Sequence, residues 1–192
     1  MMRITGGQLL GRKLHAPTGG VVRPATDMLR VALFNMLSKR TQDARVLDLF
    51  AGSGVLSFEA LSRGAGKVLF VERSRNAAAV LKRNIERAGF AEQAEVVTAA
   101  VKRALALIAR RGERFALIFA DPPYNRGELA RLLLDPLFIE VAGDARLIVV
   151  EHSPQEPLPT AELYETVRER VYGDTAVTII APAVERDTTT GA

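Results

Sequence analysis

The sequence contains no cysteine and only two histidines, His15 and His152, among its 192 residues. Without cysteine, disulfides, thiolate metal sites and thiol nucleophiles are excluded. The histidines lie far apart and lack metal-ligand spacing, so we expect surface or loop positions for both and no metal site. No apolar run approaches the roughly 18 residues of a membrane span, and Met1–Gly7 lacks the apolar core of a signal peptide. We therefore expect a cytoplasmic protein without a membrane partner.

Positive charge is concentrated in the N-terminal quarter of an otherwise ordinary composition, with 48% hydrophobic and 25% charged residues. Residues 1–45 hold eight basic and two acidic side chains, whereas the remaining residues have a small acidic excess. Local positive charge attracts phosphate backbones. The skew therefore favours a polyanionic partner, with a solvated basic surface as the alternative.

Apolar runs of strand length alternate with segments of helical period after residue 45. Their Val, Ile, Leu and Phe content is typical of parallel strands covered on both faces. The predicted strands are Arg45–Phe50, Lys67–Val71, Ala94–Thr98, Phe115–Ala120 and Arg146–Val150. The predicted helices are Val55–Arg63, Arg75–Ala88, Val101–Arg111 and Glu128–Leu134. This alternation predicts a doubly wound, Rossmann-like α/β domain.

Both ends of the chain depart from this alternation. Near the C-terminus, two β-rich runs flank Gly173-Asp174, namely Val167–Tyr172 and Thr175–Ala181, which predicts an antiparallel hairpin that closes the parallel sheet. Near the N-terminus, short extended pieces around glycines favour a small hairpin, and Thr26 is a candidate helix N-cap. We therefore divide the chain into a basic extension over residues 1–25, a core domain over residues 26–181 and a disordered tail over residues 182–192.

A glycine turn, Asp48–Gly54, follows the first core strand. Glycines permit a tight turn and the close approach of a ligand. Ser57 stands where a dinucleotide-binding turn has its third glycine, which disfavours a pyrophosphate site, and Glu72 ends the next strand, where a carboxylate can accept both ribose hydroxyls. The pattern predicts a nucleoside site suited to a sulfonium cofactor, with Asp48 acting through water or on the ammonium group. A capped loop without a ligand is the alternative.

Asp121-Pro122-Pro123-Tyr124 ends the fourth strand run. The prolines stop sheet pairing and fix an extended backbone. The Asp121 carboxylate and the Pro122 carbonyl would then accept the two N–H groups of an exocyclic base amine and aim its lone pair at a methyl donor. Asp121 would also take or relay the released proton, and Tyr124 would stack on an extruded base. The pattern predicts methylation of an amine nitrogen.

With both motifs in this order, the chain resembles the class I methyltransferases that modify amines, and more narrowly the bacterial 16S rRNA guanine-N2 methyltransferases of the RsmD type. The matching segments are Arg3–Gly7, Gly11–Leu14, Arg23–Asp27, Leu33–Asn35, Leu47–Gly54, Glu59–Ala65, Phe70–Glu72, Asp121–Tyr124 and Tyr172–Thr175. The resemblance implies a seven-stranded, mostly parallel sheet with an antiparallel C-terminal strand, S-adenosylmethionine as the cofactor with S-adenosylhomocysteine as its product, and a guanine N2 of 16S rRNA in the small ribosomal subunit as the target. The choice of guanine over adenine rests on this resemblance alone.

The resemblance also assigns site residues. The catalytic set is Asp121, Pro122, Pro123 and Tyr124. The cofactor-binding set is Asp48, Phe50, Ala51, Gly52, Ser53, Gly54, Glu72 and Arg73. The RNA-binding set is Arg3, Arg12, Lys13, Arg23, Thr26 and Arg30. Thr98–Val101 lacks the acidic residue with which many members meet the adenine amine, so we expect backbone contacts to the adenine.

Three alternatives stay open at this point. A DNA adenine-N6 methyltransferase would use the same catalytic turn, but only about 45 residues precede the core, which leaves no obvious target-recognition domain. A protein-amide methyltransferase would usually have Asn in place of Asp121. A nucleic-acid-binding module that keeps a nucleoside pocket without turnover need not retain Asp121 and Tyr124. We expect a monomer.

Overall fold

The computed structural model describes residues 2–17, 27–123, 127–156, 158–159 and 162–183. Seven strands form one sheet in the order β5-β4-β3-β6-β7-β9-β8. They are β3 (Arg45–Asp48), β4 (Lys67–Glu72), β5 (Ala94–Thr98), β6 (Leu117–Ala120), β7 (Leu147–His152), β8 (Tyr164–Tyr172) and β9 (Thr175–Pro182). The pairs among β3 to β7 are parallel, and β9 runs antiparallel to both β7 and β8. This topology confirms the predicted sheet with its reversed last strand.

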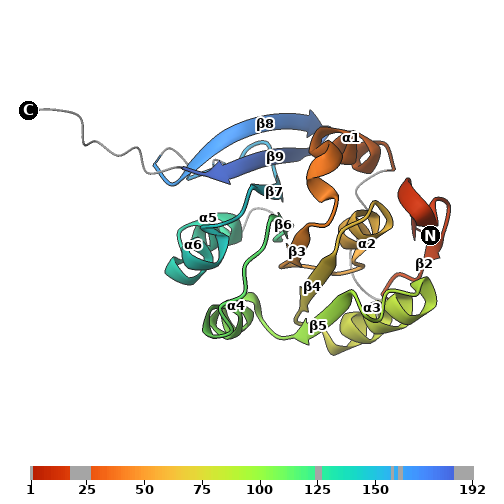
Figure 1. The fold of residues 1–192 in the computed structure, drawn as a ribbon. Helices are drawn as coiled ribbons and strands as arrows, with labels where there is room; N and C mark the ends of the chain where they lie inside the picture. The colour runs from red at the N-terminus through yellow and green to blue at the C-terminus, as the bar shows by residue number, and fades with distance from the viewer. Residues whose placement is uncertain (1, 18–26, 124–126, 157, 160–161, 184–192) are drawn as a thin grey trace, which may run out of the picture.

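Helices cover both faces of the sheet and make a three-layer sandwich (Figure 1). The first face is covered by α1 (Asp27–Leu37), α2 (Val55–Ser62) and α3 (Arg75–Ala88), and the second by α4 (Val101–Arg110), α5 (Glu128–Leu133) and α6 (Pro136–Ala142). Strand side chains alternate between the faces: Val46 and Phe119 are buried on the first, Leu47 and Ile118 on the second. The continuous apolar runs in the sequence follow from this double coverage.

Helix α6 is absent from the sequence-based prediction, although its start carries a clear signal. Asp135 is the N-cap, and its side chain accepts a hydrogen bond from the Leu137 amide at 2.9 Å. Pro136 occupies the first turn, where its missing N–H costs nothing. The helix then buries Phe138 and Val141 against the second face.

The predicted N-terminal hairpin is present as β1 (Met2–Arg3) and β2 (Lys13–Leu14), joined through a 3-10 turn over Gly7–Leu9. It lies beside α2 and α3 (Figure 1). Met2, Ile4 and Leu14 are buried in the same apolar cluster as α1 and α2. The extension is therefore packed into the core of the domain through its alternate apolar residues.

The C-terminal hairpin starts earlier and ends later than its β-rich runs predicted. Strand β8 begins at Tyr164, whose hydroxyl donates to the Leu133 carbonyl at 3.0 Å. Pro182 ends β9, and the Ala183 amide donates to the Leu163 carbonyl at 2.9 Å. The prediction of a disordered tail from residue 182 was therefore wrong for its first two residues, because strand pairing continues through them. Residues 184–192 lie outside the described part of the chain.

Candidate functional site

Four parallel strands place a carboxylate at the same edge of the sheet. Along β4, β3, β6 and β7, in that spatial order, these residues are Glu72, Asp48, Asp121 and Glu151. Each lies two positions after an apolar residue of the first face, so strand alternation directs all four toward that face. The glycine turn follows β3 at this edge. Ligands of open α/β sheets bind at such carboxyl ends, so the topology joins the two sequence motifs into one site.

Glu72 is held in place by the backbone of two turns. One carboxylate oxygen accepts the Gly52 amide at 2.9 Å, and the other accepts the Ser74 amide at 2.6 Å. Ser74 in turn caps α3 through its hydroxyl, which accepts the Ala77 amide. Each carboxylate oxygen can accept more than one hydrogen bond, so this anchored group retains acceptor capacity for the two hydroxyls of a ribose.

The two glycines of the turn serve different purposes, although both have positive φ angles, 51° at Gly52 and 74° at Gly54. A Cβ at Gly52 would meet only the Phe50 carbonyl oxygen, at 3.8 Å, so the turn faces open space where a nucleoside would fit. A Cβ at Gly54 would lie 2.5 Å from Leu81 and 3.0 Å from Phe58. Gly54 is therefore required for helix packing. Gly52 is the glycine at which a ligand could approach the backbone closely.

Asp48 is buried, with 5% of its surface exposed. Its carboxylate accepts a 2.7 Å hydrogen bond from the Ser57 hydroxyl on α2. Burial, and to a lesser extent the charge of Glu72, raise the pKa of Asp48 to about 7, against the opposing effect of the Ser57 hydrogen bond. The side chain thus fixes the start of α2 to the end of β3, which explains the serine in the third glycine position.

The remaining residues of the predicted cofactor set surround the turn. Phe50 is half-buried, Ala51 and Ser53 are buried, and Arg73 is exposed just after β4. Their contacts to a cofactor stay predictions.

Asp121 retains solvent exposure directly after β6, while Pro122 is buried. Protein atoms packed around the carboxyl group, followed by the charges of Glu151 and Asp48, raise the pKa of Asp121 well above its usual value. A carboxyl group with a raised pKa is better able to hold a proton near neutral pH, as a proton acceptor in catalysis requires. Tyr124 lies outside the described residues, so its stacking role stays a prediction.

Glu151 and His152 are buried at the end of β7, with 6% and 3% of their surface exposed. The prediction of a surface or loop position for His152 was wrong. Its ring nitrogens lie 2.9 Å from the Ser153 carbonyl oxygen and 2.9 Å from the Thr178 hydroxyl on β9. The sequence around Glu151 shows only a strand end, because the pairing of β7 with β9 that covers both residues is not visible in the local pattern.

The predicted RNA-binding residues do not all lie on the surface. Arg3, Arg12 and Lys13 are exposed on the hairpin. Arg12 and Lys13 line a groove against α3, together with Arg87, which sequence reasoning did not assign to RNA. The side chain of Asn84 holds this edge through paired hydrogen bonds with the His15 backbone, at 3.1 and 2.9 Å.

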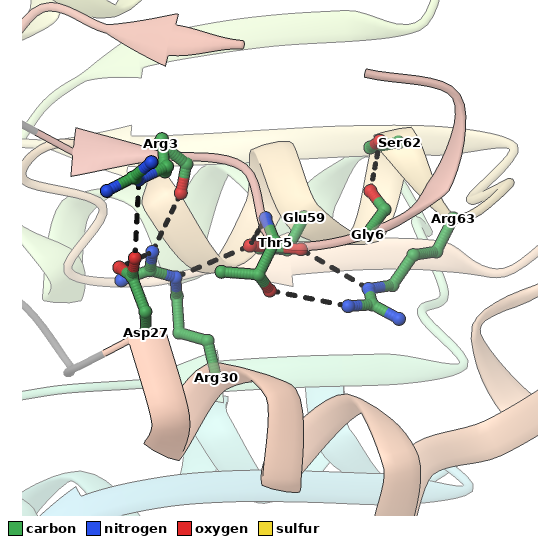
Figure 2. Close-up of polar contacts among 8 residues, drawn as sticks. All are labelled: Arg3, Thr5, Gly6, Asp27, Arg30, Glu59, Ser62 and Arg63. Atoms are coloured by element: carbon green, nitrogen blue, oxygen red, sulfur yellow. Dashed lines mark hydrogen bonds and ion pairs between the residues drawn. The ribbon is translucent and has the colours of Figure 1, made fainter. Parts of the chain in front are cut away.

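Arg30 does not belong to this surface. It is fully buried, and Figure 2 shows its guanidinium between the hairpin and α2. It donates to Asp27 and to the Arg3 carbonyl, each at 2.7 Å, and pairs with the buried Glu59 at 3.4 Å. The RNA-binding assignment was wrong because the hairpin covers this face of α1. Arg23 and Thr26 lie outside the described residues.

Glu59 is the centre of this buried polar cluster, which ties the hairpin to α2 (Figure 2). Besides Arg30, it accepts the Thr5 amide at 2.5 Å and pairs with Arg63 at 3.3 Å. Gly7 lies so close to α2 that a Cβ there would be 1.9 Å from the Ser62 carbonyl oxygen. The glycine pair that follows Thr5 is therefore explained by close packing against α2.

Two other features, a membrane-spanning helix and a metal cluster, are absent from the described residues. No helix among them is long and apolar enough to cross a membrane. Within the same ranges, no group of three or more His, Cys, Asp or Glu side chains is arranged to hold a metal ion.

Comparison with known proteins assigns the family. The family model described as conserved hypothetical protein 95 matches residues 2–181. The ribosomal RNA small subunit methyltransferase D of Escherichia coli K12 is 39% identical over 181 residues, which cover 91% of this chain and 87% of that protein. The chain belongs to this RsmD family. The membership confirms the resemblance seen in the sequence.

Solved structures agree with the family at the level of the fold. The hypothetical protein TTHA0928 of Thermus thermophilus superposes with a TM-score of 0.76 at 34% identity, over 94% of this chain and 99% of that one. SMU.776, solved in complex with SAH, has a TM-score of 0.64 at 15% identity, over 80% of this chain and 48% of that one. The predicted Rossmann-like methyltransferase fold is confirmed, and S-adenosylmethionine as the cofactor stays a prediction.

Proposed function

We propose that this RsmD-family protein transfers a methyl group from S-adenosylmethionine to the exocyclic N2 of a guanine in 16S rRNA of the small ribosomal subunit. The names of the relatives, ribosomal RNA small subunit methyltransferases, support methylation of rRNA. The observation that carries the chemistry is the shared edge, where Asp121 and the Gly52 turn lie at the ends of adjacent strands.

The residues at this edge can organise the transfer. When bound, S-adenosylmethionine supplies a methyl group on a positively charged sulfur. Asp121 accepts one N–H of the base amine, and the Pro122 carbonyl accepts the other, so the nitrogen lone pair points at the methyl carbon. Asp121 would take the N–H proton that the amine loses on methylation.

Anchored acceptors suit the nucleoside half of the cofactor. Glu72, fixed by the Gly52 and Ser74 amides, would receive the ribose hydroxyls. The Ala99 amide already donates to the Glu72 carbonyl at 3.1 Å, so it does not serve the adenine. We expect the adenine to be met by other backbone groups around the start of α4.

The hairpin would contact the RNA backbone. Arg3, Arg12 and Lys13 are exposed there and face phosphates without reading bases. The hairpin contacts α2 at Glu59 and Ser62, one to two turns beyond the Gly52 turn. An RNA that reaches both the basic hairpin and Asp121 would therefore cross the first helical face of the domain.

One experiment tests this function against its alternatives. The protein is incubated with methyl-labelled S-adenosylmethionine and with unmodified small subunits, free 16S rRNA or DNA, and the labelled nucleoside is identified after digestion. N2-methylguanosine from the subunits or the rRNA is the expected product. Label in N6-methyladenine would favour the DNA adenine methyltransferase instead, and no label in any substrate would favour a binding module without turnover.

A further inference from the structure

Two carboxylates lie on neighbouring strands at the candidate active site, and the transfer step uses only one of them. Ala120 on β6 pairs with Val150 on β7, so Asp121 and Glu151 each follow directly after paired residues of parallel strands. Strand alternation directs both side chains to the first face. Glu151 therefore stands beside the group that receives the base amine, on the side away from the cofactor turn on β3.

The environment of Glu151 differs from that of an ordinary strand end. The residue is 6% exposed, and its neighbour across the antiparallel pair is the buried Val177. Its negative charge acts on Asp121 strongly enough to contribute to the raised pKa of that group. Asp121 and Glu151 thus place two carboxylates side by side at one edge of the sheet, and a ligand with neighbouring N–H groups matches two adjacent acceptors.

Guanine has this pattern along one edge. Its N1–H lies next to the N2 amine, whereas adenine has an acceptor lone pair at N1. An ionised carboxylate only accepts hydrogen bonds, so it matches the first edge and repels the second. We propose that Glu151 accepts the N1–H of the target guanine while Asp121 holds N2, and that Glu151 thereby selects guanine over bases with an acceptor at N1. This inference rests on the proposed function and supplies its base specificity.

The test uses 2-aminopurine, which keeps the 2-amino group but has a lone pair at N1. The 16S rRNA is ligated from a synthetic fragment that carries guanine or 2-aminopurine at the methylated position, then reconstituted into small subunits. Values of kcat/KM are measured on both substrates for the wild type, Glu151→Gln and the exposed control Glu165→Gln. Cofactor Kd and thermal unfolding establish that each variant is folded.

A site built around an N–H donor rejects an analogue that lacks it, so we expect the wild type and Glu165→Gln to prefer guanine by about 10³-fold or more. The amide of Glu151→Gln can donate to the N1 lone pair. We expect its preference for guanine to fall at least about tenfold, through both a lower value on guanine and a higher value on 2-aminopurine.

The outcomes separate this inference from the function beneath it. If the wild type places no methyl group on guanine N2, the proposed function fails. If it does, but Glu151→Gln lowers kcat/KM equally on both bases and moves the pH profile, Glu151 acts only through the proton affinity of Asp121, and the inference is overturned. A folded Glu151→Gln with unchanged rates and unchanged preference would overturn it as well.

Discussion

The strand-end carboxylates and the Glu59 cluster both gather charged side chains, but their chemistry is opposite. At the strand ends, the charge of Glu72 adds to the effect of burial in raising the pKa of Asp48, and the charges of Glu151 and Asp48 do the same for Asp121. In the cluster, Glu59 is fully buried yet faces two arginines and a backbone amide. The first arrangement places like charges near one another, whereas the second pairs a buried negative charge with positive ones.

The difference teaches how to tell a functional group of charges from a structural one in this fold. A buried ion pair with its hydrogen bonds satisfied holds elements together, and removing one partner leaves an uncompensated charge. A group of like charges with raised pKa values marks a place where protons or ligands are exchanged. Three substitutions test this contrast and a fourth tests the exposed charges, in order of decreasing expected effect.

Asp121→Ala tests the proposed function of the strand-end carboxylates. It removes the group that we propose to accept the base N–H and its proton, so we expect turnover to fall about 10³-fold. Cofactor affinity should stay within about twofold, since Glu72 and the Gly52 turn are untouched. Methyl incorporation and calorimetric binding measure the two quantities, with the exposed Asp144→Ala as control. A tenfold loss of cofactor affinity with normal saturated turnover would contradict the assigned role.

Glu59→Gln tests the contribution of the buried Glu59 cluster to stability. Arg30, which is 1% exposed at its side chain, would lose its charge partner on α2, and we expect the free energy of unfolding to drop by about 3 kcal/mol. Urea denaturation measures the loss. The matched control is Glu95→Gln, whose pair with Arg111 is solvent-exposed, so we expect a much smaller change in the free energy of unfolding. Equal losses in the two variants would show that the buried cluster is not a structural centre.

Asp48→Asn tests the strand-end carboxylates through the pH dependence of folding stability. The folded-state pKa of about 7 lies above the usual value of 3.8, so between these values the folded protein binds more protons than the unfolded chain. Stability should therefore be highest at low pH within this window and fall as pH rises toward 7, by an amount on the order of 2 kcal/mol between pH 5 and pH 8.

The asparagine keeps an acceptor for Ser57 but does not titrate, and its neutrality also lowers the proton affinity of Asp121. We expect the loss between pH 5 and pH 8 to shrink by about half or more, as measured by urea titrations across this range. An unchanged slope in the variant would mean that Asp48 is ionised throughout, and the functional reading of this strand end would then depend on Asp121 and Glu151.

Lys13→Gln tests the exposed charges, which belong to neither buried group. Loss of one phosphate contact should weaken 16S rRNA binding a few-fold at low salt and lower the salt dependence, expressed as the slope of log K against log salt, by about 1. Filter binding across a salt series measures both. Lys102→Gln on α4, at the opposite face of the sheet, is the control. If both variants behave alike, the hairpin does not carry the RNA contact.

Much of the fold followed from local patterns. Apolar runs placed five parallel strands, Gly173 placed the C-terminal hairpin, and the segment around Gly52 placed the turn at the end of β3. Helix α6 was missed because its seven residues hold too little periodicity, although Asp135-Pro136 marked its start. Arg30 was misassigned because a basic residue on a helix shows nothing of what covers it.

The sequence alone determined which groups we propose to carry the chemistry: the Asp121 motif, the glycine turn and Glu72 are local signals set by what turns and strand ends require. The tertiary structure was needed to show which charged side chains are buried and which charges lie next to one another. Burial depends on which segments far apart in the chain pack together, and a charge changes its proton affinity with its neighbours in space. For that reason Arg30 became part of a closed ion cluster with Glu59, and Glu151 became a neighbour of Asp121 at the strand ends.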